Sequence, residues 1–181
     1  MEKLKKIGIV FGCYIPLHEG HKLLIEDALA ENDEVIVVVC GYDDDRGKDY
    51  IPFKSRYGLL CEKYKNEERI CVIDLDDKEL GLTGLFDYTS WKIWCRGLFE
   101  NLYQKYGYAF NFYKSTVTWY TGEWSYAEKI GQVFPQDNFK IYSRNNISVS
   151  GTKIRNDFEK YNCFIDEDFK EWLVQNGKVK E

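Results

Sequence analysis

The most informative part of this sequence is Gly12-Cys13-Tyr14-Ile15-Pro16-Leu17-His18-Glu19-Gly20-His21. It follows the apolar run Ile7–Phe11, which reads as a buried strand, and it leads into His21–Ala30, whose apolar spacing is that of an amphipathic helix. Such a strand, loop and helix start aim the helix N-terminus at the carboxyl edge of a sheet. Unpaired N–H groups and the helix dipole favour an anion there, so this loop is a candidate phosphate site.

The loop also contains both histidines of the chain, His18 and His21, three residues apart. An imidazole N–H can donate to phosphoryl oxygens at neutral pH without a buried permanent charge, and Gly12 and Gly20 let the backbone approach a phosphate closely. Ordinary surface histidines are one alternative. Zinc ligands are another, although the zincin pattern has a four-residue step and a third ligand here would have to be a thiol or a carboxylate. Neither G-x-G-x-x-G nor G-x-x-x-x-G-K-[ST] follows the strand, which weakens a dehydrogenase or P-loop kinase interpretation.

Along the rest of the chain, apolar runs alternate with segments of helical period, which predicts β-α-β units and a parallel sheet. Glu34–Cys40 is the clearest buried strand, because it is rich in β-branched residues and bounded by polar ones. The remaining expected strands are Arg69–Leu75, Ser115–Tyr120 and Phe139–Tyr142, and the remaining expected helices are Phe53–Lys65, Tyr88–Tyr106, Tyr126–Phe134, Gly151–Phe158 and Glu167–Asn176. We expect an α/β fold over residues 1–181, a single domain with a Rossmann-like doubly wound parallel sheet of about five strands and ligands at the strands' carboxyl ends.

Composition narrows the partners and the compartment. The 181 residues are 44% hydrophobic and 17% aromatic, which suffices for one sizeable core, and the net charge of −5 argues against nucleic acid and anionic membranes as partners. The N-terminus has no apolar signal-like stretch, and no window reaches transmembrane length. The six cysteines form no C-x-x-C pair, so we expect free, mostly buried thiols in a reducing cytoplasm, with a structural zinc site as a weaker alternative.

A second basic segment lies near the C-terminus, in Ile147-Ser148-Val149-Ser150-Gly151-Thr152-Lys153-Ile154-Arg155. Ser150 and Thr152 are good capping residues, so a second helix start is expected to point into the site. Lys153 and Arg155 add positive charge beside it, and Arg can grip a phosphate through two N–H groups. Taken alone, the segment could equally be a capped surface helix with two basic residues.

Together, the two segments resemble the paired signatures of the HxGH nucleotidyltransferase superfamily of adenylyl- and cytidylyltransferases. The first is similar to G-x-F-x-P-x-H-x-G-H, with Tyr14 where Phe is usual and Cys13 where Lys is frequent; the second is similar to [IV]-S-x-T-x-[IV]-R. In more detail the chain resembles the NadR-type nicotinamide mononucleotide (NMN) adenylyltransferases. This resemblance covers nearly the whole chain and rests on the Ile7–Gly12 start, the pair Trp91 and Trp94, the turn Thr121-Gly122-Glu123, and the basic residues Arg56, Arg144 and Lys153.

The resemblance implies the reaction of ATP and NMN to NAD and pyrophosphate, with Mg²⁺ accompanying ATP and no dedicated protein ligands for the metal. It assigns catalysis to His18, His21, Lys153 and Arg155. The implied ATP site also includes Gly12, Tyr14, Gly20, Arg144, Ser150 and Thr152, and the implied NMN site includes Phe11, Gly12, Arg56, Trp91 and Trp94. An indole face could stack on the cationic nicotinamide ring, although tryptophans at helical spacing are as often core residues. The acidic run Asp43–Asp45 could hold Mg²⁺, but a solvated loop is the better interpretation, and Asp76-Asp77 is treated likewise.

Other functions stay open at this point. Phosphopantetheine adenylyltransferases and glycerol-3-phosphate cytidylyltransferases share the first signature, and nicotinate mononucleotide is a closely related acceptor. A nucleotide sensor that has kept the fold and lost turnover is an alternative from another class. The sequence does not define the oligomeric state.

Overall fold

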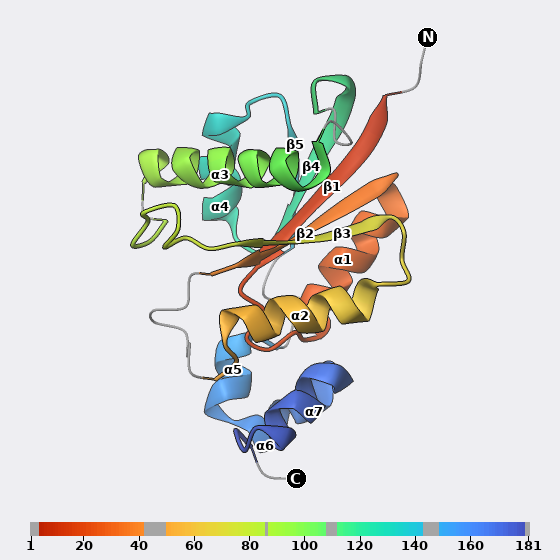
Figure 1. Cartoon of the computed structure of the whole chain (residues 1–181), viewed down its shortest axis with the longest axis vertical. Helices are drawn as coiled ribbons and strands as arrows, with labels where there is room; N and C mark the ends of the chain where they lie inside the picture. The colour runs from red at the N-terminus through yellow and green to blue at the C-terminus, as the bar shows by residue number, and fades with distance from the viewer. Residues whose placement is uncertain (1–3, 42–49, 86, 108–111, 143–148, 180–181) are drawn as a thin grey trace.

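The chain folds around one parallel sheet of five strands (Figure 1). The computed structural model describes residues 4–41, 50–85, 87–107, 112–142 and 149–179. The strands are β1 (Lys5–Gly12), β2 (Glu34–Cys40), β3 (Ile70–Leu75), β4 (Ser115–Thr121) and β5 (Asn138–Ile141). Their order is β3-β2-β1-β4-β5, and each neighbouring pair is parallel. The predicted Rossmann-like doubly wound fold is confirmed.

Helices cover both faces of this sheet. One face packs against α1 (Glu19–Glu31) and α2 (Phe53–Tyr64), and the other against α3 (Tyr88–Tyr106) and α4 (Trp124–Val133) (Figure 1). The C-terminal helices α5 (Gly151–Asn156), α6 (Phe158–Tyr161) and α7 (Glu167–Gln175) gather at one end of the molecule, where α7 contacts α2. Two short 3-10 helices, η2 (Phe112–Lys114) and η4 (Asn162–Phe164), complete the described elements.

The alternation of side chains along β2 divides the interior into two cores. Val35, Val37 and Val39 face the layer of α1, α2 and α7, whereas Ile36, Val38 and Cys40 face the layer of α3 and α4. A parallel strand buried on both faces needs a continuous apolar run, which is why this segment was recognisable in the sequence. The six cysteines are free, but only Cys40 and Cys95 are buried, so the expectation of mostly buried thiols is wrong.

Local capping explains where two helices depart from their expected bounds. Helix α1 begins at Glu19 instead of His21, because His18 is its N-cap and accepts a hydrogen bond from the Gly20 N–H. The single helix expected over Gly151–Phe158 is wrong: α5 ends at Asn156, and Asp157 caps a separate helix, α6, by accepting from the Lys160 N–H. Both departures lie beside the predicted phosphate site.

The connections reverse direction between β1 and β4, since the chain runs from β1 outward to β2 and β3 and then returns to β4 on the other side. Ligands of open α/β sheets bind at such a switch point, beyond the carboxyl ends of the strands. Gly12 at the end of β1 and Thr121 at the end of β4 therefore mark the expected site. None of the described helices is long and apolar enough to cross a membrane.

Candidate active site

His18 lies at the switch point and is a neutral hydrogen-bond donor. Its exposed fraction is 6%, and its Nδ1 accepts from the backbone N–H of Gly20 at 3.1 Å. Because Nδ1 presents a lone pair, the proton of the neutral ring is on Nε2, which can donate to a ligand. Burial lowers the pKa of His18 from its usual 6.5 to about 4, and the positive charge of Arg155 lowers it in the same direction. The ring is therefore uncharged at neutral pH.

His21 stacks on His18 and is supported from within the protein by Tyr14. The two imidazole centroids are 3.9 Å apart with an interplanar angle of 23°, and the Tyr14 ring centroid is 4.8 Å from that of His21. Tyr14 is fully buried and has a φ of 52°, a left-handed conformation that is uncommon for a residue with a side chain and turns the loop sharply. A Cβ added to Gly12 would lie 3.6 Å from Nε2 of His21, so the end of β1 lies close to the second imidazole.

The C-terminal motif lies against this loop. The Arg155 Nη1 donates to the Ile15 carbonyl oxygen at 2.6 Å, a contact between residues 140 positions apart, and its Nη2 donates to Thr152 Oγ1 at 3.3 Å. A Cβ added to Gly151 would lie only 2.7 Å from the same Ile15 oxygen. The start of α5 thus packs directly against the backbone between Tyr14 and His18, and the two motifs are in contact.

The remaining residues of the predicted ATP site lie in the start of α5, in the histidine loop and in a segment outside the described residues. Ser150 caps α5, since its Oγ accepts from the Lys153 N–H at 3.3 Å, and the Lys153 side chain is exposed. Arg144 and the acidic run Asp43–Asp45 lie outside the described residues. Tyr14 has an exposed fraction of 0%, so it supports His21 and offers no surface to a ligand in this structure.

Arg56 reaches the site from α2 but serves the backbone. It is completely buried; its Nε donates to the Ile51 carbonyl at 3.1 Å, and its Nη1 donates to the carbonyls of Cys40, at 3.0 Å, and Cys13. One guanidinium therefore ties together the ends of β1 and β2 and the start of α2. Arg56 therefore supports the backbone of the histidine loop through the Cys13 carbonyl, and a direct contact with NMN stays a prediction.

The predicted aromatic residues form a cluster under the carboxyl end of β1, on the face opposite α1. The Phe11 ring centroid lies 5.4 Å from Trp94 and 6.2 Å from Trp91, and Tyr126 of α4 lies 5.1 Å from Trp91. The exposed fractions of Trp91 and Trp94 are 1% and 0%. Neither indole presents a face to solvent, so the structure places both in the core, and stacking on a ligand requires the rim of the cluster to move.

Two aromatic residues near the site were missed by sequence reasoning. Trp124 begins α4 directly after the turn at the end of β4 and is 71% exposed, which is unusual for so large an apolar side chain. Tyr50 lies near Arg155, whose charge lowers the Tyr50 pKa although burial raises it more. The signal for Trp124 was present in its position after a predicted strand; no pattern in the sequence pointed to Tyr50.

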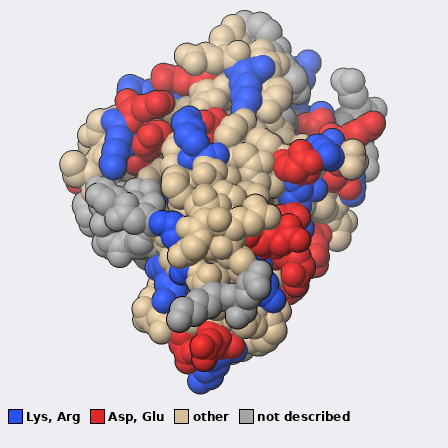
Figure 2. All heavy atoms as spheres, turned by 60° about the horizontal axis from the view of Figure 1, so that its bottom comes forward, with Lys and Arg blue, Asp and Glu red and all other residues tan. Residues whose placement is uncertain are grey.

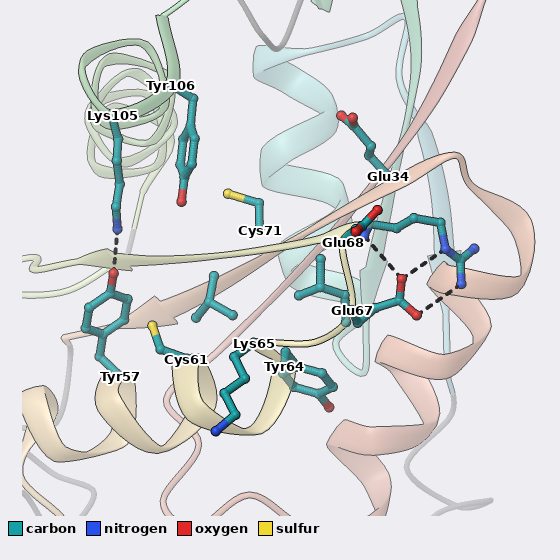
Figure 3. A pocket seen from close by; sticks show the side chains of 13 residues that line it. Glu34, Tyr57, Cys61, Tyr64, Lys65, Glu67, Glu68, Cys71, Lys105 and Tyr106 are labelled. Carbon is teal, nitrogen blue, oxygen red and sulfur yellow. Dashed lines mark hydrogen bonds and ion pairs between the residues drawn. The ribbon is translucent and has the colours of Figure 1, made fainter.

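A cavity of about 460 Å³ lies elsewhere, at the edge strand β3 between α2 and α3 (Figure 3). Lys105 of α3 reaches across this edge and donates to the Tyr57 hydroxyl of α2 at 2.5 Å, while Cys61 and Cys71 line the walls between them. The β3 residues that line it belong to the amino-terminal half of the strand. The cavity is therefore separate from the site at the carboxyl ends.

The surface around the C-terminal helices carries acidic and basic side chains interspersed with one another (Figure 2). Among the residues that the structure describes, no group of three or more His, Cys, Asp or Glu side chains is placed to hold a metal ion. The net charge of the chain is −5, so the positive charges of Lys153 and Arg155 beside the histidine loop are a local feature.

A doubly wound sheet with a histidine-bearing loop at its switch point, and a basic helix start beside that loop, is typical of nucleotide-binding α/β proteins. Residues 9–157 match the Cytidylyltransferase-like family, and the chain belongs to this family of nucleotidyltransferases. The sequence-based assignment to the nucleotidyltransferase superfamily is thereby confirmed.

Individual relatives agree with this assignment. The trifunctional NAD biosynthesis/regulator protein NadR of Salmonella typhimurium is 28% identical over 194 residues, which cover 97% of this chain and 42% of the relative. A crystal structure of NadR protein in complex with NAD and AMP-PNP superimposes with a TM-score of 0.70 at 32% identity, over 91% of this chain and 46% of that one. A bifunctional NMN adenylyltransferase/ADP ribose pyrophosphatase from Francisella tularensis shares the fold, with a TM-score of 0.64 at 16% identity. The match covers 98% of this chain and 50% of that one. The chain spans less than half the length of the curated relatives it matches.

Proposed function

We propose that this chain is a nicotinamide-nucleotide adenylyltransferase that converts ATP and NMN to NAD and pyrophosphate. The observation that carries the proposal is the contact between the two motifs, in which neutral His18 lies within the field of Arg155 and Arg155 is fixed by the Ile15 carbonyl. The relatives support the choice of substrates, since one is named for NAD biosynthesis and another was crystallised with NAD and an ATP analogue. Residues 1–181 would act as one nucleotidyltransferase domain.

In the proposed reaction an oxygen of the NMN phosphate attacks the α-phosphorus of MgATP in line. The bond from that phosphorus to the bridging oxygen breaks, and pyrophosphate leaves with the electron pair. No covalent intermediate with the enzyme is needed. The protein has to position two anions and neutralise the charge that builds up between them.

His18 and His21 would donate to ATP phosphate oxygens, with His18 nearer the transferred group. The Nε2–H of His18 suits this role, because a neutral donor in a dry site stabilises developing charge without the cost of a buried cation. The Gly20 N–H sets the orientation of the His18 ring by donating to Nδ1. Gly20 would also let a phosphate approach the backbone at the start of α1. The backbone of Gly12 would border the phosphates.

Lys153 and Arg155 would hold the β- and γ-phosphates and stabilise the leaving pyrophosphate. Ser150 and Thr152 hold the backbone and the Arg155 guanidinium of this segment in place, and Arg144 would contribute from the preceding segment. Mg²⁺ would be held mainly by ATP itself, with few or no protein ligands, and would neutralise part of the phosphate charge.

NMN would bind between the carboxyl ends of β1 and β4, with its nicotinamide ring on the cluster of Phe11, Trp91, Trp94 and Tyr126. Contact of the cationic ring with an indole face contributes about 1–2 kcal/mol. Trp124 is exposed at the start of α4, two residues before Tyr126, and would meet the ring before the buried indoles do. Arg56 would support this side by holding the Cys13 and Cys40 carbonyls.

A panel of acceptors tests the proposal. The protein is incubated with MgATP and either NMN, nicotinate mononucleotide or phosphopantetheine, and with MgCTP and glycerol 3-phosphate, and products are identified by mass spectrometry. NAD formed from NMN at the highest rate is the expected result. Faster transfer to another acceptor would keep the mechanism and replace the substrate, whereas ATP binding with no pyrophosphate released from any pair would establish the non-catalytic sensor instead.

A further inference from the structure

We propose that Asp166 is a positioning residue, which locks the C-terminal segment against the histidine loop and thereby fixes His18 for the transfer. The proposal rests on the proposed function and adds to it a residue outside both sequence motifs. Asp166 lies between η4 and α7, and its exposed fraction is 3%. A carboxylate so buried has to be matched by nearby cations or donors.

Two lysines from two different helices supply that match. The Asp166 Oδ2 is 2.6 Å from the Nζ of Lys63 on α2 and 3.9 Å from the Nζ of Lys22 on α1, whose closer partner is Glu19 at 2.6 Å. Lys22 directly follows His21 in the first turn of α1, and its backbone N–H donates to the His18 carbonyl at 3.1 Å. The carboxylate therefore couples α2 to the turn that carries both histidines.

The backbone of the same segment pairs with the histidine loop. The Asp166 N–H donates to the Leu17 carbonyl at 3.1 Å, and Ile165 forms an antiparallel bridge with His18 itself. Ile165 and Leu17 are both buried in the core that also contains Phe169 and Leu173 of α7. The backbone of Leu17 and His18 is thus held by a strand-like pairing with Ile165 and Asp166. The ion pair between Asp166 and Lys63 lies at the end of this pairing.

The Asp166 carboxylate pairs with Lys63 and does not cap its own helix, α7. Asp166 occupies the N-cap position of α7 and makes no capping hydrogen bond there, although Asp87 and Asp157 both cap their own helices. Its second oxygen, Oδ1, is buried and has no hydrogen-bond partner among the described residues. A residue that served only to start α7 would cap it. The observed geometry instead sets the spacing of α1, α2 and α7 around the loop.

Removal of the charge should misplace His18 more than it unfolds the protein. A shift of the order of 1 Å in a catalytic group can reduce the rate by about 100-fold, and a relaxed loop should therefore lower kcat by about 10-fold or more. The KM values for ATP and the acceptor should change by less than about threefold, because the partners of Asp166 across the described part of the fold are Leu17, Lys22 and Lys63, and none of these lies on α5 or in the aromatic cluster.

The test compares Asp166→Asn with Asp168→Asn. Asp168 is a matched control: it lies two residues away, its side chain is 57% exposed, and it is 4.0 Å from the same lysine, Lys63. Measured are kcat, both KM values, the melting temperature and the imidazole NMR signals, which are readily assigned because the chain has two histidines. We expect a lower kcat and a displaced His18 signal in Asp166→Asn, and neither change in Asp168→Asn. A folded Asp166→Asn protein with an unchanged His18 signal and unchanged kcat overturns the proposal.

Lys63→Met provides a second, independent reading if Asp166→Asn does not fold. It removes the partner from a helix position where the side chain is 25% exposed, and it should also displace the His18 signal and lower kcat. A folded Lys63→Met protein with the wild-type His18 signal and the wild-type kcat would contradict the proposal that the Asp166–Lys63 ion pair positions His18. If the wild-type protein transfers no nucleotide at all, the proposed function fails, while the NMR comparison still decides whether Asp166 positions His18.

Discussion

At the residue scale, the proposed chemistry depends on one side chain with two duties. His18 caps α1 through Nδ1 and would offer its Nε2–H to the ligand, and burial keeps its ring neutral. These duties are linked, because the bond from the Gly20 N–H fixes which nitrogen carries the proton. The neighbouring Arg155 adds a positive charge that opposes protonation of the ring.

The first prediction concerns the pKa of His18. An NMR titration of the imidazole Cε1 proton should show His18 neutral down to about pH 4, because burial is the larger cause of the lowered pKa and Arg155 the smaller. Arg155→Met should raise the pKa only part of the way towards 6.5. A full return to the usual value in Arg155→Met would mean that the charge, and not burial, controls the ring.

The same pKa shift has a consequence for stability. Between pH 6.5 and 4 the unfolded chain protonates His18 while the folded chain does not, so the free energy of unfolding should fall as the pH decreases through this range. The loss should reach about 3 kcal/mol at pH 4 and level off below it. Urea melts of wild type and His18→Asn at several pH values isolate this effect, since Asn retains the cap and does not titrate; a pH-independent difference between the two proteins would refute it.

At the element scale, the site depends on how closely α5 approaches the histidine loop. Gly151→Ala would place a methyl group 2.7 Å from the Ile15 carbonyl oxygen, which is backbone and cannot swing away. We expect α5 to be pushed from the loop, the bond from Arg155 to Ile15 to lengthen, and kcat to fall by about 10-fold or more. Steady-state kinetics measure this effect, and a variant with wild-type turnover would show that α5 need not touch the loop.

A glycine on α2 gives the matched comparison. Gly58 is exposed, and a Cβ added there would meet no atom within 4 Å. Gly58→Ala should therefore stabilise the protein by about 0.5–1 kcal/mol through helix propensity and leave turnover unchanged. Chemical denaturation measures the first quantity; a destabilised Gly58→Ala protein would contradict the described packing of α2.

At the scale of the whole molecule, we propose that this acidic chain binds ATP by concentrating its cations and N–H groups at one edge of the sheet. Binding of AMP-PNP with Mg²⁺ to the folded state alone should raise the free energy of unfolding by about 2.7 kcal/mol at 100 times the dissociation constant. Thermal melts with increasing ligand measure the gain. Arg155→Met should need more ligand for the same shift, and an equal shift in both proteins would remove Arg155 from the ATP site.

Most of the fold could be predicted because its strands are buried on both faces. Glu34–Cys40 and Tyr88–Tyr106 were placed at their observed bounds from apolar runs and helical period alone. The two motifs were also recognised, since their glycines, histidines and capping residues are chemically unusual at that spacing. What sequence patterns could not supply was the partner of each polar group across the fold.

Four residues illustrate that limit. Arg56 donates to carbonyls from three segments, a contact set that exists only after folding, while its expected contact with NMN stays a prediction. Trp91 and Trp94 have the same helical spacing whether they line a pocket or the core, and the structure places them in the core. Asp166 has the sequence position of a helix cap, yet its carboxylate turns to Lys63 on another helix.

The most direct test of the central claim is NAD formation by the wild-type protein and by His18→Ala, with MgATP and NMN as substrates. NAD can be quantified by coupling to alcohol dehydrogenase. We predict NAD formation by the wild type and a kcat lower by about 100-fold or more in His18→Ala, with smaller changes in KM, because loss of a transition-state donor has that size of effect. Near-normal turnover in a folded His18→Ala protein would contradict the role of this histidine, and absence of NAD from the wild type would contradict the proposed reaction.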